Sequence, residues 1–122
     1  MAINSNALAG KAYVSVDGQT LMAAGAFEYS PSKVTRETLT GQDAVHGYSE
    51  KPIAGHISGT IRDSGDLSVA GLNNMTDVTV VLELANGKFV TGRNMWTVES
   101  QTSKSEDGTI EVKWEGPSVT EQ

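Results

Sequence analysis

The segment Asp77–Lys88, with the sequence DVTVVLELANGK, decides the fold class of this chain. Its apolar side chains recur at every second position, on one face: Val78, Val80, Leu82 and Leu84. A period of two predicts a half-buried β-strand over Asp77–Ala85. Asn86-Gly87 comes next, and this pair is a strong signal for a two-residue hairpin turn. The chain should therefore reverse at once and pair with itself in an antiparallel sheet.

Similar alternation extends in both directions from this strand and predicts Lys11–Val16, Gln19–Met22, Ala26–Ser30, Lys33–Thr40, Ile53–Arg62, Lys88–Ser100 and Thr109–Glu115. The predicted inward residues are Ala12, Val14 and Val16, then Ile57, Gly59 and Ile61, and finally Ile110, Val112 and Trp114. In Lys88–Ser100, strict alternation puts Phe89 and Met95 on one face and Val90, Trp96 and Val98 on the other. Both tryptophans are interpreted as core residues.

Leu67, Ala70 and Leu72 recur at helical spacing after possible N-caps, which predicts one short helix over residues 66–74. The strand and turn patterns in the remainder of the sequence predict a mainly-β single domain, 1–122, of about seven strands. The architecture should be a β-sandwich or partly closed barrel with the helix on one flank. Between and beyond the core strands we expect a flexible N-terminal arm at 1–9, a long inter-strand loop at about 31–52 that includes the exposed Lys33–Thr40 segment, a polar loop at 101–108 and a polar tail at 117–122.

Composition limits the function classes. The 122 residues include no cysteine, which leaves neither disulfides nor thiolate metal sites. The net charge of −6 opposes binding to nucleic acid or anionic membrane, although it suits a passage through which a polyanion slides. The N-terminus lacks the pattern of a signal peptide, and no apolar run is long enough to span a bilayer. We expect a protein made in the cytoplasm.

The segment Gly41–Pro52, GQDAVHGYSEKP, has the residue types of an active site. Asp43, His46, Glu50 and the later His56 could together be metal ligands, but their spacing matches no zinc or calcium pattern. Loop hydrogen bonds or interface contacts explain these histidines more simply. Helix capping explains the DSGD run at residues 63–66 more simply than a calcium loop does, and no nucleophile elbow, phosphate loop or dinucleotide motif is present. We predict no catalytic residue, metal ligand or cofactor.

Four motifs together resemble the tail tube protein family of Mu-like phages and prophages. They are GQD-x-VHGY-x-EKP at 41–52, G-T-x-x-D at 59–63, L-N-x-x-T-D-V-T-V at 72–80 with LELANGK after it, and RN-x-W at 93–96 with EGPS at 115–118. The resemblance covers roughly residues 8–118. Ala44 and His56 depart from it, since a glycine and an apolar residue are expected there.

The resemblance implies a small β-sandwich with a flanking helix, like that of type VI secretion tube proteins. Copies would form six-membered rings that stack into the hollow inner tube of a contractile tail. A tape measure protein would fill the lumen during assembly, DNA would pass through it without specific binding, and a sheath protein would surround it. The protein would be a virion component, assembled in the cytoplasm of the host bacterium, with no catalytic activity and no membrane insertion.

The resemblance also implies that the 31–52 excursion reaches an adjacent subunit or ring. Its candidate contact residues are Arg36, Glu37, Asp43, His46, Tyr48, Glu50 and Lys51. Acids on the predicted strands are candidates for the lumen surface: Glu83, Glu99, Glu111 and Glu115. Two other hypotheses stay open at this point: a sugar- or peptide-binding β-sandwich that uses Trp96 or Tyr48, and a metal-assisted hydrolase built on His46 and His56.

Overall fold

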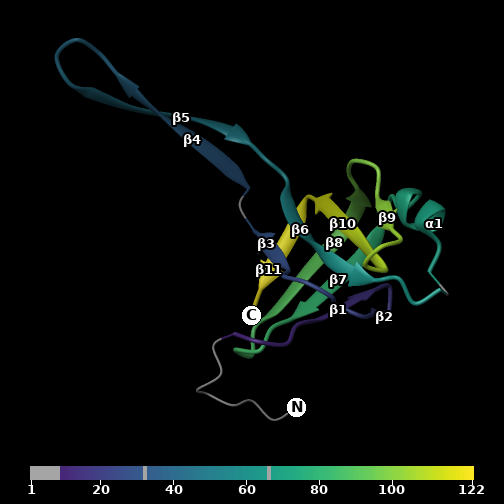
Figure 1. The fold of residues 1–122 in the computed structure, drawn as a ribbon. Helices are drawn as coiled ribbons and strands as arrows, with labels where there is room; N and C mark the ends of the chain where they lie inside the picture. Colours follow the sequence, from purple (N-terminus) through teal and green to yellow (C-terminus); the bar gives the residue numbers. More distant parts are fainter. Residues whose placement is uncertain (1–8, 32, 66) are drawn as a thin grey trace.

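The computed structural model describes residues 9–31, 33–65 and 67–122, and it shows a β-rich body from which a long hairpin projects (Figure 1). In chain order the elements are β1 (Tyr13–Val16), β2 (Gln19–Leu21), β3 (Glu28–Ser30), β4 (Val34–Thr40), β5 (Val45–Pro52), β6 (Gly55–Arg62), α1 (Val69–Asn73), β7 (Val78–Glu83), β8 (Phe89–Thr97), β9 (Thr102–Lys104), β10 (Thr109–Gly116) and β11 (Ser118–Glu121). The mainly-β fold class with one short helix is confirmed. No helix in these ranges is long and apolar enough to cross a membrane.

The body is a single antiparallel sheet in the order β2-β1-β7-β8-β10-β6-β3, with β11 paired to β8 and β9 to β10. The long strand β8 joins its two halves. The first part of β8 pairs with β7 and β11, and its last residues, Trp96 and Thr97, pair with β10. An isolated bridge between Ala23 and Ile61 brings the β2 end back to β6. The sheet therefore folds over itself into a sandwich that is partly closed as a barrel.

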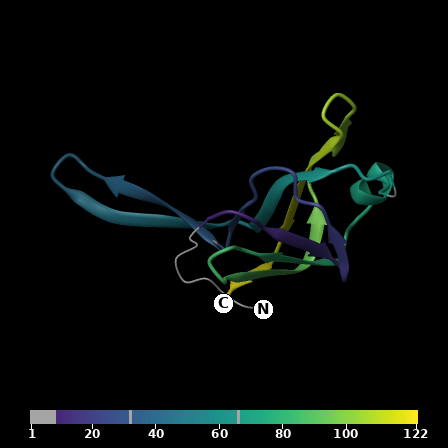
Figure 2. The ribbon, with the colours of Figure 1, turned by 60° about the horizontal axis from the view of Figure 1, so that its bottom comes forward.

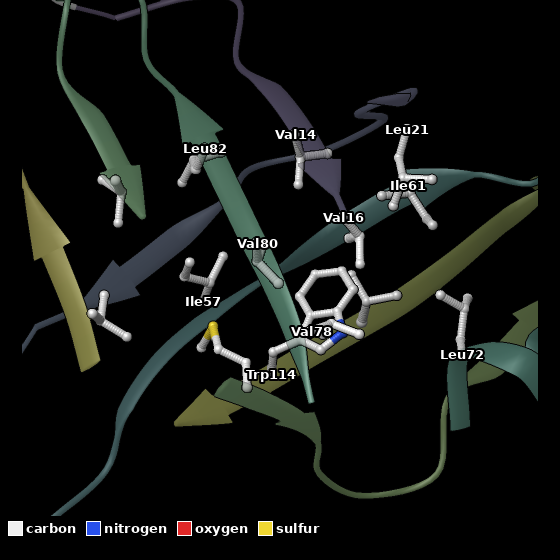
Figure 3. Packing of buried hydrophobic residues seen from close by; sticks show 14 of the residues in the cluster. Val14, Val16, Leu21, Ile57, Ile61, Leu72, Val78, Val80, Leu82 and Trp114 are labelled. Carbon is white, nitrogen blue, oxygen red and sulfur yellow. The ribbon is translucent and has the colours of Figure 1, made fainter. Parts of the chain in front are cut away.

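One hydrophobic core lies between the two halves of the sheet (Figure 3). Every second residue of β7 and β10 enters it: Val78, Val80, Leu82, Ile110, Val112 and Trp114. Val14 and Val16 of β1 and Ile57 and Ile61 of β6 complete its walls. The predicted inward faces of these four strands are confirmed, since alternation along a strand holds wherever the pairing is regular.

The alternation predicted for β8 is wrong, because a β-bulge changes its phase. Val78 pairs with Met95 and Val80 with Gly92, so a three-residue step along β8 lies opposite a two-residue step along β7. Asn94 takes up the extra residue with a left-handed backbone, φ 54°. Val90 and Met95 are thereby both fully buried, whereas Trp96 turns outward and stays 39% exposed. Trp96 is not a core residue.

The helix is shorter than predicted. Ser68 caps α1 by accepting a hydrogen bond from the Gly71 N–H at 3.0 Å, and the helix ends at Asn73 instead of residue 74. Leu72 buries its side chain in the core, and the Thr97 hydroxyl donates to the Leu72 carbonyl at 2.6 Å. These contacts fix the helix to the end of β8. Residue 66 lies outside the described residues.

Several segments predicted to be irregular contain strands. The 31–52 loop is mostly the β4–β5 hairpin, the 101–108 loop contains β9, and the 117–122 tail forms β11. Pro117 precedes β11 without breaking its pairing with β8, because the strand begins only at Ser118. Of the expected flexible arm at 1–9, residues 1–8 lie outside the described part of the chain.

Replacing Val80 with Asp should unfold the body. Val80 is 0% exposed at the centre of the core, and an unpaired buried carboxylate costs about 4 kcal/mol or more. Circular dichroism and thermal melting would show loss of the cooperative transition. The control is Thr20→Asp on β2, an exposed position, which should melt close to the wild-type chain. A folded Val80→Asp variant with wild-type stability would contradict the assigned core.

Candidate functional site

The β4–β5 hairpin is a separate two-stranded sheet that extends well away from the body (Figures 1 and 2). No residue from 34 to 52 is buried. A lone two-stranded hairpin is marginally stable in water, and its outer edges leave backbone donors and acceptors open. Contact with another molecule would therefore stabilise the hairpin, because it would pair the open strand edges and cover the exposed side chains.

Regular pairing shapes this hairpin. Val34 lies opposite Pro52, Arg36 opposite Glu50 and Thr38 opposite Tyr48, before the register shifts between Leu39 and Thr40. The Gly41 N–H donates to the Ala44 carbonyl at 2.9 Å and closes the turn at the tip. Sequence reasoning missed β5 because of its glycine, proline and charges. One signal could have found β5. A strand at Lys33–Thr40 needs a partner strand, and an antiparallel partner is expected directly after the next turn.

Three candidate contact residues lie together on one face of the hairpin. Arg36 Nε is 3.5 Å from Glu50 Oε1, and the Arg36 guanidinium carbon lies 5.4 Å from the centre of the Tyr48 ring. The arginine is thus held between an acid and an aromatic face, which contributes a cation–π attraction and limits its rotamers. Tyr48 remains 59% exposed, so this ordered cluster presents an aromatic ring to the surroundings.

Glu37 and Lys51 occupy the opposite face. Their positions alternate with those of Arg36 and Glu50 along the two strands. Within the described ranges, neither residue takes part in an ion pair. These two charges are therefore available to a partner, in contrast to Arg36 and Glu50, which neutralise each other.

Asp43 and His46 form a third group at the tip. The His46 Nε2 lies 3.0 Å from Asp43 Oδ1. This hydrogen bond is the main reason why the pKa of Asp43 is below its usual value. Both side chains are largely exposed, so the pair orders the turn without forming a sheltered site.

Large apolar side chains are also concentrated on this projection. Of the exposed large hydrophobic residues in the described chain, half belong to the hairpin or its root: Leu39, Val45, Tyr48 and Ile53. Exposed apolar side chains beside open strand edges are typical of a surface that another protein covers.

The structure divides the candidate lumen acids between two surfaces. Glu83 points outward from β7, in a row with Tyr13 of β1 and Phe89 of β8. Glu111 and Glu115 point outward from β10, and Glu111 and Glu99 line a polar hollow of about 350 Å³. Because both halves of the sheet bury their inner faces in one core, these two outer faces point in opposite directions. Glu83 therefore cannot share a surface with the other three.

The polar hollow beside Glu99 and Glu111 also has positively charged side chains. Lys104 Nζ lies 2.9 Å from Glu111 Oε1, and Lys113 lines the same hollow. Glu83 differs in another way, because its Oε1 atom is buried without a hydrogen-bond donor among the described residues. The carboxylate of Glu83 is thus less exposed to solvent than that of Glu111.

The structure does not assemble the proposed metal site. His46 lies at the hairpin tip and His56 on β6 of the body. Among the residues described, no group of three His, Asp or Glu side chains is placed to hold a metal ion. The two exposed aromatics of the binding-module hypothesis, Tyr48 and Trp96, also belong to separate elements, one to the hairpin and one to β8.

Comparisons with known proteins agree with a tube-type fold. A family model described as phage tail tube protein matches residues 5–121. The Mu-like prophage FluMu tail tube protein of Haemophilus influenzae is 32% identical over 85% of this chain and 86% of its own length. The tail tube protein of Escherichia phage Mu is 26% identical over 84% of this chain and 85% of its own.

A solved structure shares the fold at lower identity. A chain in the cryo-EM structure of the anti-feeding prophage cap, the AFP tube terminating cap, superposes with a TM-score of 0.59 at 16% identity. The match covers 100% of this chain and 99% of the other. Together, the family model and the two relatives identify the class of this chain as tail tube structural proteins. This chain is a member of the phage tail tube protein family, of the Mu-like type.

Replacing His46 with Ala should raise the pKa of Asp43 toward its ordinary value, because the hydrogen bond that lowers it is lost. A lowered carboxyl pKa stabilises the tip above the ordinary aspartate pKa, and this contribution disappears as pH falls through the folded-state pKa. Carboxyl-carbon NMR titration measures the shift. An unchanged Asp43 titration in the variant would show that the pair at the tip does not form.

Proposed function

We propose that this chain is the self-assembling subunit of an inner tail tube, in which six copies form a ring and rings stack around a lumen that DNA traverses. The observation that carries the proposal is the β4–β5 hairpin, an element without buried residues on a body that belongs to the tail tube family. Joining copies would cover its open edges and exposed apolar side chains. In this role the chain has no catalytic activity.

The hairpin supplies the contacts between copies in this proposal. Glu37 and Lys51 pair with charges of a neighbouring copy, and Tyr48 is the aromatic anchor. Arg36 and Glu50 hold Tyr48 in place, while Asp43 and His46 order the tip. The seven candidate residues thus divide into those that bind the neighbour and those that shape the hairpin.

The outer face of β6 and β10 lines the lumen in this proposal. It carries Glu111 and Glu115, with Glu99 at its border, and its strand β6 continues directly from the hairpin. Lys104 and Lys113 lie beside these acids, so the face has no excess of positive charge to hold the phosphate backbone, and DNA passes without binding. Glu83 faces the opposite side, toward a sheath protein, and a tape measure protein occupies the lumen before DNA does. The assembled protein is a virion component that forms in the host cytoplasm.

Removing the hairpin should abolish assembly and leave the body folded. Replacing residues 36–50 with Asn-Gly keeps Thr35 opposite Lys51 across a favoured two-residue turn. Since no residue of the removed segment is buried, the melting transition should persist. Light scattering and negative-stain microscopy measure assembly.

The control for this experiment is Lys104→Gln, which breaks an exposed ion pair on the body and should leave tubes intact. Normal tubes from the hairpin-deleted chain would overturn the assigned role of the hairpin. A wild-type chain that stays monomeric at every concentration and salt would overturn the proposed function itself.

Reversing charge on the lumen face should make tubes retain DNA. Glu111→Lys with Glu115→Lys changes the net charge of each subunit by +4, and we expect tubes of this variant to capture short DNA that wild-type tubes exclude. Fluorescence of labelled DNA in sedimented tubes measures the effect. The contrast is Glu83→Lys on the opposite face, which should retain no DNA within the lumen. Equal exclusion by all three tubes would contradict this choice of lumen face.

A further inference from the structure

The last strand of the chain, β11, lies beside the root of the hairpin. It pairs with β8 through Val119 opposite Gly92 and Glu121 opposite Val90. The Phe89 and Gln122 backbones exchange two further hydrogen bonds, at 3.0 and 3.4 Å. This segment has the composition of a solvated tail, yet Val119 is only 3% exposed. The end of the chain is therefore part of the packed body.

Two connections attach the hairpin to the body, and β11 contacts both. The first leads out of β3, whose Tyr29 donates its hydroxyl hydrogen bond to Glu121 Oε2 at 2.5 Å. The same Glu121 oxygen lies 3.6 Å from Lys88 Nζ. Glu121 thus joins the strand before the hairpin to the turn that begins β8.

The second connection leads into β6, and here the contact is steric. A Cβ atom placed on Gly55 would lie 2.7 Å from Val119 Cγ2 and 3.0 Å from the Ser30 carbonyl oxygen. Such a close approach is possible only for glycine. Between the two connections, the Ile53 N–H donates to the Lys33 carbonyl at 2.9 Å and closes the root of the hairpin.

We propose that β11 is a brace that sets the direction of the β4–β5 hairpin, with Tyr29, Val119 and Glu121 as its positioning residues. A ribbon that projects from two short connections pivots unless its root is held from the side, because the β3–β6 pairing extends over only three residue pairs. β11 supplies that lateral support at both connections. A fixed direction reduces the conformational entropy lost when the hairpin meets a neighbouring copy, and this consequence rests on the proposed function.

Ionisation of the three linked groups is consistent with the brace. The hydrogen bond from Tyr29 lowers the pKa of Glu121, with Lys88 contributing, and the pKa values of Tyr29 and Lys88 are both raised. The stabilisation from Glu121 is present above the ordinary glutamate pKa and is lost as pH falls through its lowered folded value. The stabilisation from Tyr29, whose pKa is raised by its hydrogen bond to Glu121, and from Lys88, whose pKa is raised by the charge of Glu121, is present below their ordinary pKa values and is lost as pH rises through the raised folded pKa values. The brace is complete between these limits.

Distance measurements between spin labels test the brace directly. The chain has no cysteine, so spin labels on the double variant Gln42→Cys at the tip and Thr20→Cys on the body report one distance. Double electron–electron resonance on the dilute full-length chain should give a narrow distribution. Tyr29→Phe and Glu121→Ala should broaden it, since each removes the side-chain link, and Val119→Ala should broaden it by removing the steric contact.

The matched control is Tyr13→Phe, which removes a tyrosine hydroxyl from β1, away from the hairpin root, and should leave the distribution narrow. Thermal melting of each variant shows whether the body is folded. Val119→Ala can loosen the core, whereas Tyr29→Phe keeps the aromatic ring and removes only the hydrogen bond to Glu121. Distributions as narrow as wild type in both Tyr29→Phe and Glu121→Ala would overturn the brace. Failure of the proposed function is seen separately, as a wild-type chain that stays monomeric at every concentration and salt.

Discussion

A two-stranded ribbon has no interior in which side chains can be buried, and this constraint limits how the β4–β5 hairpin can be stabilised. Its strands pair with each other and with nothing else in the described chain, so both outer edges stay open. It keeps its shape through cross-strand contacts such as the Arg36 pairing with Glu50 and through the closed root at Ile53. Those interactions are individually weak in water. In the proposed brace, contacts with the body at the hairpin root therefore hold this projection in one direction.

The body can carry such a projection because its hydrophobic core contains no residue of the hairpin. Both halves of the sheet bury their inward side chains in the same core, and β8 links the halves through one continuous strand. The two outer faces are left free to differ. One presents Glu111 and Glu115, and the other presents Glu83 beside exposed aromatic rings. A single small domain thus presents three distinct surfaces, and the proposed function assigns them to a lumen, an outer partner and a neighbouring copy.

Alternation in the sequence predicts the regular part of this fold well. Asp77–Ala85 and Thr109–Glu115 became β7 and β10 with the expected residues buried, because regular pairing preserves a period of two. The outward position of Trp96 was not predictable, since it depends on a one-residue bulge at Asn94 that only the partner strand defines. Sequence alone did not indicate β5 or β11 for a related reason. Pairing with β4 overrides the glycine, proline and charge content of β5, and pairing with β8 forms β11 directly after the strand-ending pair Gly116-Pro117. The hairpin residues were found as candidates, but their division between two faces required the register.

Hydrogen–deuterium exchange of residues 34–52, compared between assembled tubes and free subunits, would show whether a neighbouring copy covers the hairpin. In the free subunit the outward-facing amides of β4 and β5 have no partner strand. If a neighbouring copy covers the hairpin, these amides should exchange much more slowly in tubes, with protection extending to its tip at Gln42. Equal exchange across 34–52 in the two states would show that the hairpin stays open to solvent, and would contradict its role as the contact between copies.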